Sequence, residues 1–289
     1  MPTIPPLYDN PDVTEDTFDR HLTTRIEEAS LNAWPALQQI LLDGWVLRFA
    51  RGFTKRSNSI VPLYATSWTA AALSNPVDAR RMLADKIRYC ENLYAREQLQ
   101  TVFRITSFAA DTHNNDSLNT AFNRAKALLD DILEERGYTH QDTSLVLSRS
   151  ISSVPPVAGF RRLPLDQWLR AYSLLTGLPE PAQTLHALIL KGISGECAFA
   201  VLENAEGVVA CGMAVVEQSL VGLFDIYTHP AHRGRGHGTD LINGLCHWAS
   251  QAHAQQVYLQ VVADNSVALS LYQQMGFGEV YRYWYRVGP

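Results

Sequence analysis

The residues with the clearest chemistry form a glycine-rich loop between a predicted strand and a predicted helix. In order, the loop and the start of the helix contain Arg233, Gly234, Arg235, Gly236, His237, Gly238 and Thr239. The three glycines have no Cβ, so the backbone can turn tightly and approach a ligand closely. The first N–H groups of the helix and the positive end of its dipole face the same space, beside two arginines. This combination predicts a pyrophosphate-binding site, and the alternative is a structural turn.

Two common nucleotide-binding motifs do not fit this loop. A Walker motif requires a lysine after the last glycine, and the run His237-Gly238-Thr239 contains none. The dinucleotide fingerprint requires a third glycine where Thr239 stands, within a strand–helix–strand unit. The loop is preceded instead by a predicted hairpin of Cys197–Leu202 and Val208–Val216. Neither motif explains the segment.

The pattern Arg233-x-x-Gly236-x-Gly238, placed after a strand and His229-Pro230, resembles the signature of the GNAT acyltransferase superfamily. In that family the backbone amides of the loop bind the pyrophosphate of CoA. A second segment, from Asn265 to Phe277, resembles the family's second motif at the right spacing. The resemblance covers about residues 160–289. It implies a GNAT fold that uses acetyl-CoA as acyl donor and no metal.

The resemblance also implies roles for individual residues. The strand segment Ile226-Tyr227-Thr228 lends backbone groups to the pantetheine arm, and in the family it separates from its neighbour, often at a bulge. Tyr272 lies near the sulfur. The residues implied to contact CoA are Ile226, Tyr227, Thr228, the loop from Arg233 to Thr239, and Asn265. Asn265 and Tyr272 also have structural alternatives, as a helix N-cap and as a core tyrosine.

Acyl transfer to an amine needs both a base and an acid. An amine attacks a thioester only when it is unprotonated, so a base or a desolvating site must remove its proton. The leaving thiolate needs a proton, which the hydroxyl of Tyr272 can give. Asp225 is the candidate base, with Glu217 or a chain of water molecules as alternatives, and either carboxylate can be an ordinary surface group. His229 and His232 flank the loop, and they either assist phosphate binding or face solvent.

The elements that position this site alternate between strands and helices. The expected strands are Phe160–Leu163, Cys197–Leu202, Val208–Val216, Leu220–Thr228, Val257–Val262 and Val280–Arg286. The expected helices are Leu165–Leu175, Ala182–Lys191, Thr239–Ala252 and Val267–Met275. This alternation, with hairpins, predicts an α/β (α+β) fold with a mixed, mostly antiparallel sheet flanked by helices.

The N-terminal half is predicted to be a diverged copy of the same unit. Its expected helices are Arg25–Leu42, Asp78–Glu97 and Leu118–Arg136, and its expected strands are Trp45–Phe49, Ser59–Tyr64, Thr101–Ser107 and Ser144–Ser148. Both halves end with a strand, a helix, a glycine followed by an aromatic residue, and a last strand. This repetition predicts an internal duplication in which Leu133 stands at the position of Tyr272. The first half has no glycine-rich anion loop, so it resembles the degenerate domain of tandem GNAT proteins.

The expected domains are an N-terminal arm (1–19), a degenerate GNAT-like domain (20–150), a proline-containing linker (151–159) and a catalytic domain (160–289). In the degenerate domain, a hairpin from Trp45 to Asn58 gathers Arg48, Lys55 and Arg56. These cations are candidates for a wall of the acceptor site that binds a carboxylate or phosphate. Exposed strand charges around a tight turn are the alternative.

The composition limits the kinds of molecule that we expect the chain to bind. The chain has 289 residues, 46% of them hydrophobic, and a formal net charge of −5. A mildly acidic chain has no general attraction to nucleic acid or anionic lipid, and no apolar run approaches the length of a membrane span. The four cysteines have no metal-binding spacing, and the N-terminus lacks the pattern of a signal peptide. We therefore expect a cytoplasmic protein, a monomer or homodimer.

Three functions remain after this reasoning. The first is transfer of an acetyl group from acetyl-CoA to the primary amine of a small molecule. Direct attack in a ternary complex is favoured, because no cysteine or serine stands at a motif position. The alternatives are a non-catalytic CoA-binding regulatory protein and a protein or peptide N-acetyltransferase.

Overall fold

The computed structural model describes residues 15–107, 117–151 and 154–289 of the chain. Most of the expected N-terminal arm (1–14) and part of the expected linker (152–153) lie outside the described residues. Among the helices that are described, none is long and apolar enough to cross a membrane. The chain divides into two compact units, the C-terminal unit and the N-terminal unit.

The two units differ from the expected domain ranges near both ends of the chain. The C-terminal unit consists of helix α1 (Glu15–Ala33) and residues 146–261 and 265–280, and the N-terminal unit consists of residues 34–145, 262–264 and 281–289. Side-chain hydrogen bonds tie α1 to its unit: Arg25 donates to Ser219, and Asn32 donates to Glu217. The last residues belong to the N-terminal unit because they form a strand of its sheet.

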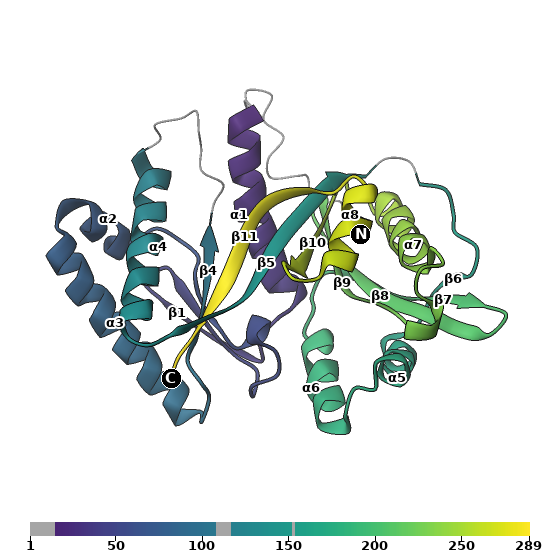
Figure 1. Ribbon diagram of the computed structural model, residues 1–289, viewed down its shortest axis with the longest axis horizontal. Helices are drawn as coiled ribbons and strands as arrows, with labels where there is room; N and C mark the ends of the chain where they lie inside the picture. Colours follow the sequence, from purple (N-terminus) through teal and green to yellow (C-terminus); the bar gives the residue numbers. More distant parts are fainter. Residues whose placement is uncertain (1–14, 108–116, 152–153) are drawn as a thin grey trace. The chain divides into compact units, whose positions relative to one another are not determined.

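The C-terminal unit is a mixed sheet with helices on both faces (Figure 1). Its strands lie in the order β5-β10-β9-β8-β7-β6, where β5 is Thr139–Ser150, which belongs to this unit from Val146 on and to the N-terminal unit before it. The bounds of the others are, in the same order, Gln256–Val262, Leu220–Thr228, Gly207–Glu217, Glu196–Asn204 and Phe160–Arg162. The pairs from β6 to β9 are antiparallel, and β9 pairs with β10 in parallel. One face of β7 to β9 is covered by α7 (His237–Gln251) and the other by α5 (Leu165–Thr176) and α6 (Glu180–Lys191). Helix α8 (Ser266–Gln274) connects β10 to the last strand.

The N-terminal unit has helices gathered on one face of its sheet. Its strands lie in the order β1-β2-β3-β4-β11-β5, where β1 is Gln38–Leu42, β2 Trp45–Phe49, β3 Ile60–Pro62, β4 Val102–Ser107 and β11 Gly278–Val287. Its helices are α2 (Ser67–Ser74), α3 (Pro76–Arg96) and α4 (Ser117–Glu135). The carboxyl-terminal strand β11 therefore lies inside this sheet, antiparallel to β4.

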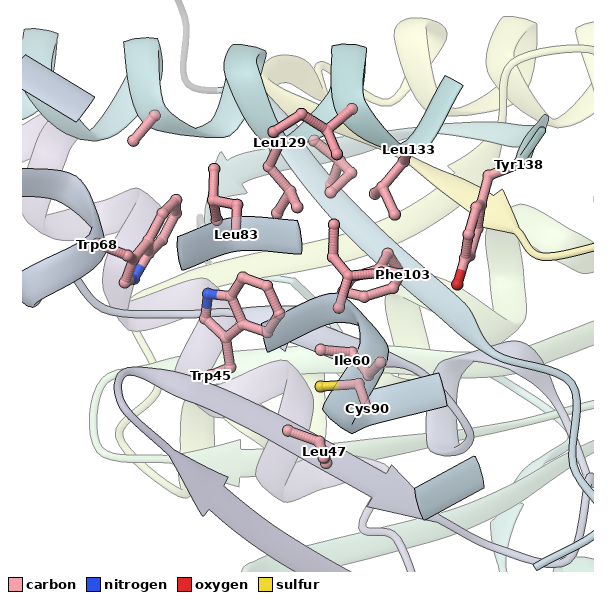
Figure 2. Close-up of a cluster of buried hydrophobic side chains, with 14 of the residues drawn as sticks. Trp45, Leu47, Ile60, Trp68, Leu83, Cys90, Phe103, Leu129, Leu133 and Tyr138 are labelled. Atoms are coloured by element: carbon pink, nitrogen blue, oxygen red, sulfur yellow. The ribbon is translucent and has the colours of Figure 1, made fainter. Parts of the chain in front are cut away.

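An aromatic cluster forms the centre of the N-terminal core (Figure 2). The indole of Trp45 on β2 meets the edge of Trp68 on α2 at a centroid distance of 5.8 Å and Phe103 on β4 at 5.6 Å. Leu83 and Leu129 pack around these rings from α3 and α4, and both are fully buried. Such edge-to-face pairs add stability beyond the apolar area that they bury.

The expected helix Arg25–Leu42 is wrong over its second part. Helix α1 ends at Ala33, and Gln38–Leu42 is strand β1, paired with β2. Pro35 explains the end, because proline disfavours helical conformation in the residue before it and cannot donate a helical hydrogen bond. Asp43 and Gly44, expected to terminate a helix, form the two-residue hairpin turn, with φ of 42° and 77°. Helix α2 was not expected, and α1 begins at Glu15, inside the expected arm.

The end of each half has the same helix cap, which supports the predicted duplication. Gly137 and Gly276 have nearly equal φ angles of 82° and 83°. The next amide returns to the helix in both copies, from Tyr138 N–H to the carbonyl of Leu133 and from Phe277 N–H to that of Tyr272, at 3.0 Å each. A residue in the left-handed region after a helix normally requires glycine. The alignment of Leu133 with Tyr272 thus follows from backbone geometry as well as from sequence order.

Strand β11 is anchored to α4 of the N-terminal unit by a half-buried carboxylate. Both oxygens of Asp130 accept hydrogen bonds from Arg286 at 2.8 Å, and one also accepts from the indole of Trp284 at 2.9 Å. Arg286 also reaches Glu134 at 2.8 Å. Burial opposes ionisation of Asp130, but the hydrogen bonds from Arg286 and Trp284 outweigh it and hold the pKa of Asp130 below its ordinary value.

We expect Asp130→Asn to lower the free energy of unfolding of the N-terminal unit by about 1.5–3 kcal/mol at pH 7, because charged hydrogen bonds are lost. A depressed pKa stabilises the fold above the ordinary pKa of aspartate and ceases to do so as the pH falls through the folded-state value. Denaturant unfolding at pH 7 and at about pH 3 should therefore show a smaller difference at the lower pH. Glu135→Gln, on the same helix in the exposed pair with Arg80, is the control and should change little. An equal loss from both variants would contradict this account.

Candidate functional site

The centre of the site is a bulge in β9, at the position where the sequence predicted the pantetheine strand. Met213 on β8 lies opposite Phe224, but Cys211 lies opposite Tyr227, so two residues of β9 face the single residue Gly212. These two residues are Asp225 and Ile226. Asp225 has a φ of 52°, a left-handed conformation that aspartate tolerates better than most residues. The bulge interrupts the ladder and leaves backbone groups of this segment available to a ligand.

The glycine-rich loop has the geometry of an anion cradle. Gly234 and Gly236 adopt φ of 74° and 84°, which a residue with a side chain rarely does. Gly236 is the N-cap of α7, and the first helical bond runs from Asp240 N–H to its carbonyl at 3.0 Å. The amides of residues 237–239 thus precede the first hydrogen bond of the helix. Because the N-cap has no side chain to accept from them, they are presented at the helix end beside the exposed Arg233 and Arg235.

The loop, the end of β9 and α8 come together, as the sequence predicted. A Cβ added at Gly238 would lie 3.6 Å from Oγ1 of Thr228 and 3.3 Å from Cδ2 of Leu271 on α8. Arg233 donates from Nε to the carbonyl of Thr228 at 3.1 Å, and its guanidinium lies 5.7 Å from the centroid of the Tyr227 ring. Arg233 therefore fastens the loop to the end of β9, in addition to the charge it provides.

Three histidines surround the loop. The ring centroids of His229 and His232 are 5.6 Å apart, and those of His232 and His237 are 6.1 Å apart. His229 accepts a hydrogen bond from the amide of Ala231, which places it in the local turn. His232 lies 3.6 Å from the carboxylate of Glu206. Both of the histidines whose role the sequence left open, His229 and His232, lie next to the loop.

Helix α8 presents the other two predicted residues. Asn265 accepts a hydrogen bond from the amide of Ala268 at 3.1 Å, so it caps α8, and its contact with CoA remains a prediction. Tyr272 is 8% exposed, with its ring edge against Phe277. Burial raises the pKa of the Tyr272 phenol above its ordinary value. The hydroxyl therefore stays protonated at neutral pH, as a proton donor must, although a core tyrosine has the same property.

Of the two candidate bases, Asp225 lies at the bulge and Glu217 does not. Glu217 is at the far end of β8, where both its oxygens accept from Asn32 of α1. Asp225 forms a hydrogen bond with a residue that the sequence analysis did not single out: Nε2 of His186 lies 2.8 Å from Oδ2 of Asp225. The side chain of His186 is 1% exposed and that of Asp225 is 14% exposed. Asp225 thus belongs to a buried pair beside the segment predicted to bind CoA.

The spacing of apolar residues in the sequence does indicate that His186 is buried. It precedes Ile189 and Leu190 by three and four residues, and all three are buried on one face of α6. That pattern identifies a buried histidine but does not identify its partner, because Asp225 is distant in the chain. A histidine on an apolar helix face is more often a core residue than a functional one, and only the fold distinguishes the two.

The hairpin expected to form an acceptor wall is held by internal bonds. Arg48 is fully buried, and its guanidinium donates to the backbone carbonyls of Arg56 and Trp34. Burial, and then the charge of the nearby Arg104, lowers the pKa of Arg48 to about 10. The expected role of Arg48 in binding an acceptor anion is therefore wrong, since its donors serve the backbone.

The other two cations of that hairpin also have partners. Lys55 pairs with Asp142 at 2.7 Å and Gln141 at 2.6 Å, and the guanidinium of Arg56 stacks over Trp34. Within the described part of the chain, no group of three or more histidine, cysteine, aspartate or glutamate side chains is arranged to hold a metal ion.

Comparison with known proteins decides the family. A family model described as "Probable histone acetyltransferase Rv0428c C-terminal" matches residues 23–106 and 123–286. The chain belongs to this family. It is 26% identical over 271 residues to the "Uncharacterized N-acetyltransferase YobR" of Bacillus subtilis (strain 168), a match that covers 91% of this chain and 97% of that protein.

A solved structure confirms the fold. The GCN5-related N-acetyltransferase from Kribbella flavida matches with a TM-score of 0.61 and 12% identity, over 92% of this chain and 95% of that one. The expected GNAT superfamily, the tandem α/β fold and the acyltransferase class are thus confirmed: the chain is an N-acetyltransferase of the GNAT type.

Because Gly212 lies opposite the bulge, we expect this position of the GNAT site to tolerate substitution poorly. A Cβ at Gly212 would lie 2.6 Å from Cδ1 of Ile226 and 3.2 Å from Cδ2 of Leu241. We expect Gly212→Ala to lower the free energy of unfolding by about 1–3 kcal/mol, because overpacking shifts the bulge. Urea unfolding measures this loss. Gly278→Ala is the control, since a Cβ there meets nothing within 4 Å. Unchanged stability in Gly212→Ala would show that the bulge adapts without cost.

Proposed function

We propose that this enzyme transfers the acetyl group of acetyl-CoA to the primary amine of a small molecule within a ternary complex. The observation that carries the proposal is the bulge at Asp225, next to a glycine loop that opens onto the uncapped amides of α7. The bulge supplies backbone groups for the thioester arm, and the amides and arginines suit the pyrophosphate. The arrangement places a carboxylate directly before the segment that would hold the acyl group.

Asp225 and Tyr272 carry out separate proton transfers in this mechanism. Asp225 takes a proton from the acceptor ammonium and passes it to solvent, which frees the nitrogen lone pair. The amine then attacks the thioester carbon, and backbone N–H groups of the segment 226–228 stabilise the oxyanion. As the C–S bond breaks, Tyr272 gives a proton to the thiolate, and the proton lost from the acylated nitrogen restores the phenol.

Direct attack is favoured over an acyl-enzyme because the thiols of the chain are poor nucleophiles. Burial raises the pKa of Cys90 and Cys211 to about 12 and that of Cys197 and Cys246 to about 11. For Cys211, which lies closest to the site, the charge of Asp225 adds to this effect. A thiol with such a pKa is almost entirely protonated at neutral pH and cannot attack a thioester efficiently.

A protein acceptor is the second candidate, and the name of the matching family model favours it, because that name refers to a histone acetyltransferase. The test is a screen of free-thiol release from acetyl-CoA with a library of small primary amines and, in parallel, lysine-containing peptides from histone tails. Turnover with small amines and none with peptides supports the proposal. Preferred turnover of peptides would overturn the small-molecule acceptor, and absence of any turnover despite CoA binding would favour a non-catalytic role.

The loop gives a direct prediction for CoA binding. We expect Gly236→Glu to reduce affinity for CoA by more than about 100-fold, because a side chain and a negative charge enter the space meant for pyrophosphate. Isothermal titration with CoA measures the effect. Gly137→Glu is the matched control, since Gly137 has nearly the same φ and equally open space around a Cβ. Tight CoA binding by Gly236→Glu would place the pyrophosphate elsewhere.

The role of Tyr272 can be separated from its packing. We expect Tyr272→Phe to lower kcat by about 10²–10⁴-fold, because the thiolate loses its proton donor. The dissociation constant for acetyl-CoA should stay within about threefold, since the ring and its contact with Phe277 are kept. Tyr258→Phe, at another buried tyrosine of the same unit, is the control. If kcat is unaffected in Tyr272→Phe, the phenol is a core group only.

A further inference from the structure

His186 is a buried histidine that the mechanism above does not use. Its ring is fixed by its surroundings on α5 and α6: the ring centroid lies 6.0 Å from that of Trp168 and 5.1 Å from that of Tyr172. Trp168 is itself fully buried and donates to the carbonyl of Ala200 on β7. The position of His186 is therefore set by packing rather than by the residue that it contacts at the bulge.

The partner of His186 has a constrained backbone and a directed side chain. Asp225 stands at the bulge with a φ of 52°, and its Oδ2 lies 2.8 Å from Nε2 of His186. A carboxylate can only accept when it is ionised, so Nε2 carries the hydrogen in this pair. The hydrogen bond uses Oδ2 and leaves Oδ1 for another donor. A short aspartate side chain held at one oxygen has little remaining rotational freedom.

We propose that His186 is a positioning residue: its Nε2–H fixes the Asp225 carboxylate so that Oδ1 faces the acceptor ammonium. This inference rests on the proposed function, in which Asp225 is the base. Reaction rates depend steeply on the alignment of the proton acceptor with the reacting group. A residue that acts only through Asp225 should affect turnover of the amine and leave CoA binding unchanged, because the pyrophosphate loop lies on other elements.

Two substitutions separate the hydrogen bond from the packing. His186→Phe keeps an aromatic ring packed against Trp168 and Tyr172 but removes the donor, whereas His186→Gln keeps an N–H donor near the position of Nε2. We expect His186→Phe to lower kcat/KM for the amine by about 10- to 100-fold, the range of a charged hydrogen bond. His186→Gln should recover most of that loss. The dissociation constant for acetyl-CoA should stay within about threefold in both variants.

A double-mutant cycle tests whether the effect passes through Asp225. In the Asp225→Asn background, His186→Phe should cause little further loss, since residues that act as a unit are not additive. An equal loss in both backgrounds, or no recovery in His186→Gln, would overturn the positioning role. A general effect on folding would appear as reduced CoA affinity and a lower melting temperature, and would also overturn it.

A measurement that needs no turnover separates this inference from the proposed function. In ¹⁵N-histidine NMR of the full chain, Nε2 of His186 should carry a proton at neutral pH, and its signal should shift in Asp225→Asn. An unprotonated Nε2 would overturn the inference even if amines are acetylated. If Nε2 is protonated and shifts as expected but no amine is acetylated, the pair stands and the proposed acceptor chemistry fails.

Discussion

The site depends on one irregularity in a sheet: two residues of β9 placed opposite Gly212. This bulge directs Asp225 toward α6 and exposes the backbone of the following segment. It places an aspartate with a left-handed backbone on one strand opposite a glycine on the other, where an added Cβ would lie close to the side chain of Ile226. The loop that follows β9 is then attached through Arg233 to the carbonyl of Thr228. The predicted anion cradle and the proposed base are thus positioned by the same few residues.

Each unit includes a segment from the other half of the chain, so neither unit corresponds to one continuous range of the sequence. Helix α1 comes from the first half of the sequence but belongs to the unit that carries the site, where Asn32 binds Glu217. Strand β11, which follows the segment from Asn265 to Phe277, is held in the other unit by Asp130. A protein cut at the expected linker would therefore remove a helix from one unit and a strand from the other. Neither expected range corresponds to a complete sheet with its own helices.

The sequence predicted the elements around the loop more accurately than the elements of the first half. Strand β9 was predicted at its observed bounds, because alternation ends at His229-Pro230 and glycines follow. The pattern does not identify strand β1, because Ile40 and Leu41 also fit a helical spacing and Asp43-Gly44 is equally typical of a helix end. The bulge position and the His186–Asp225 pair could not be predicted, because strand register and long-range side-chain contacts depend on tertiary structure.

The two units differ at their helix starts in a way that bears on the predicted anion site. Helix α3 of the N-terminal unit is equivalent in chain order to α7 of the C-terminal unit. Each is followed by a strand, a helix and the same glycine cap. The amides at the start of α3 are already satisfied: the side chain of Asn75 accepts from Val77 and Asp78. Pro76 contributes no N–H, and Asp78 adds a negative charge to the first turn.

The start of α3 therefore disfavours an anion, although the positive end of the helix dipole lies at the N-terminus of α3 just as it does at that of α7. There is also no glycine between residues 60 and 96, whereas the loop before α7 has three within five residues. At α7 the corresponding positions are Gly236, which has no side chain, and His237. The two units thus have the same glycine cap after the last helix but different helix starts. At the N-terminus of α7, which follows the bulged strand, the glycine N-cap leaves the first amides without the side-chain acceptor that Asn75 provides at α3.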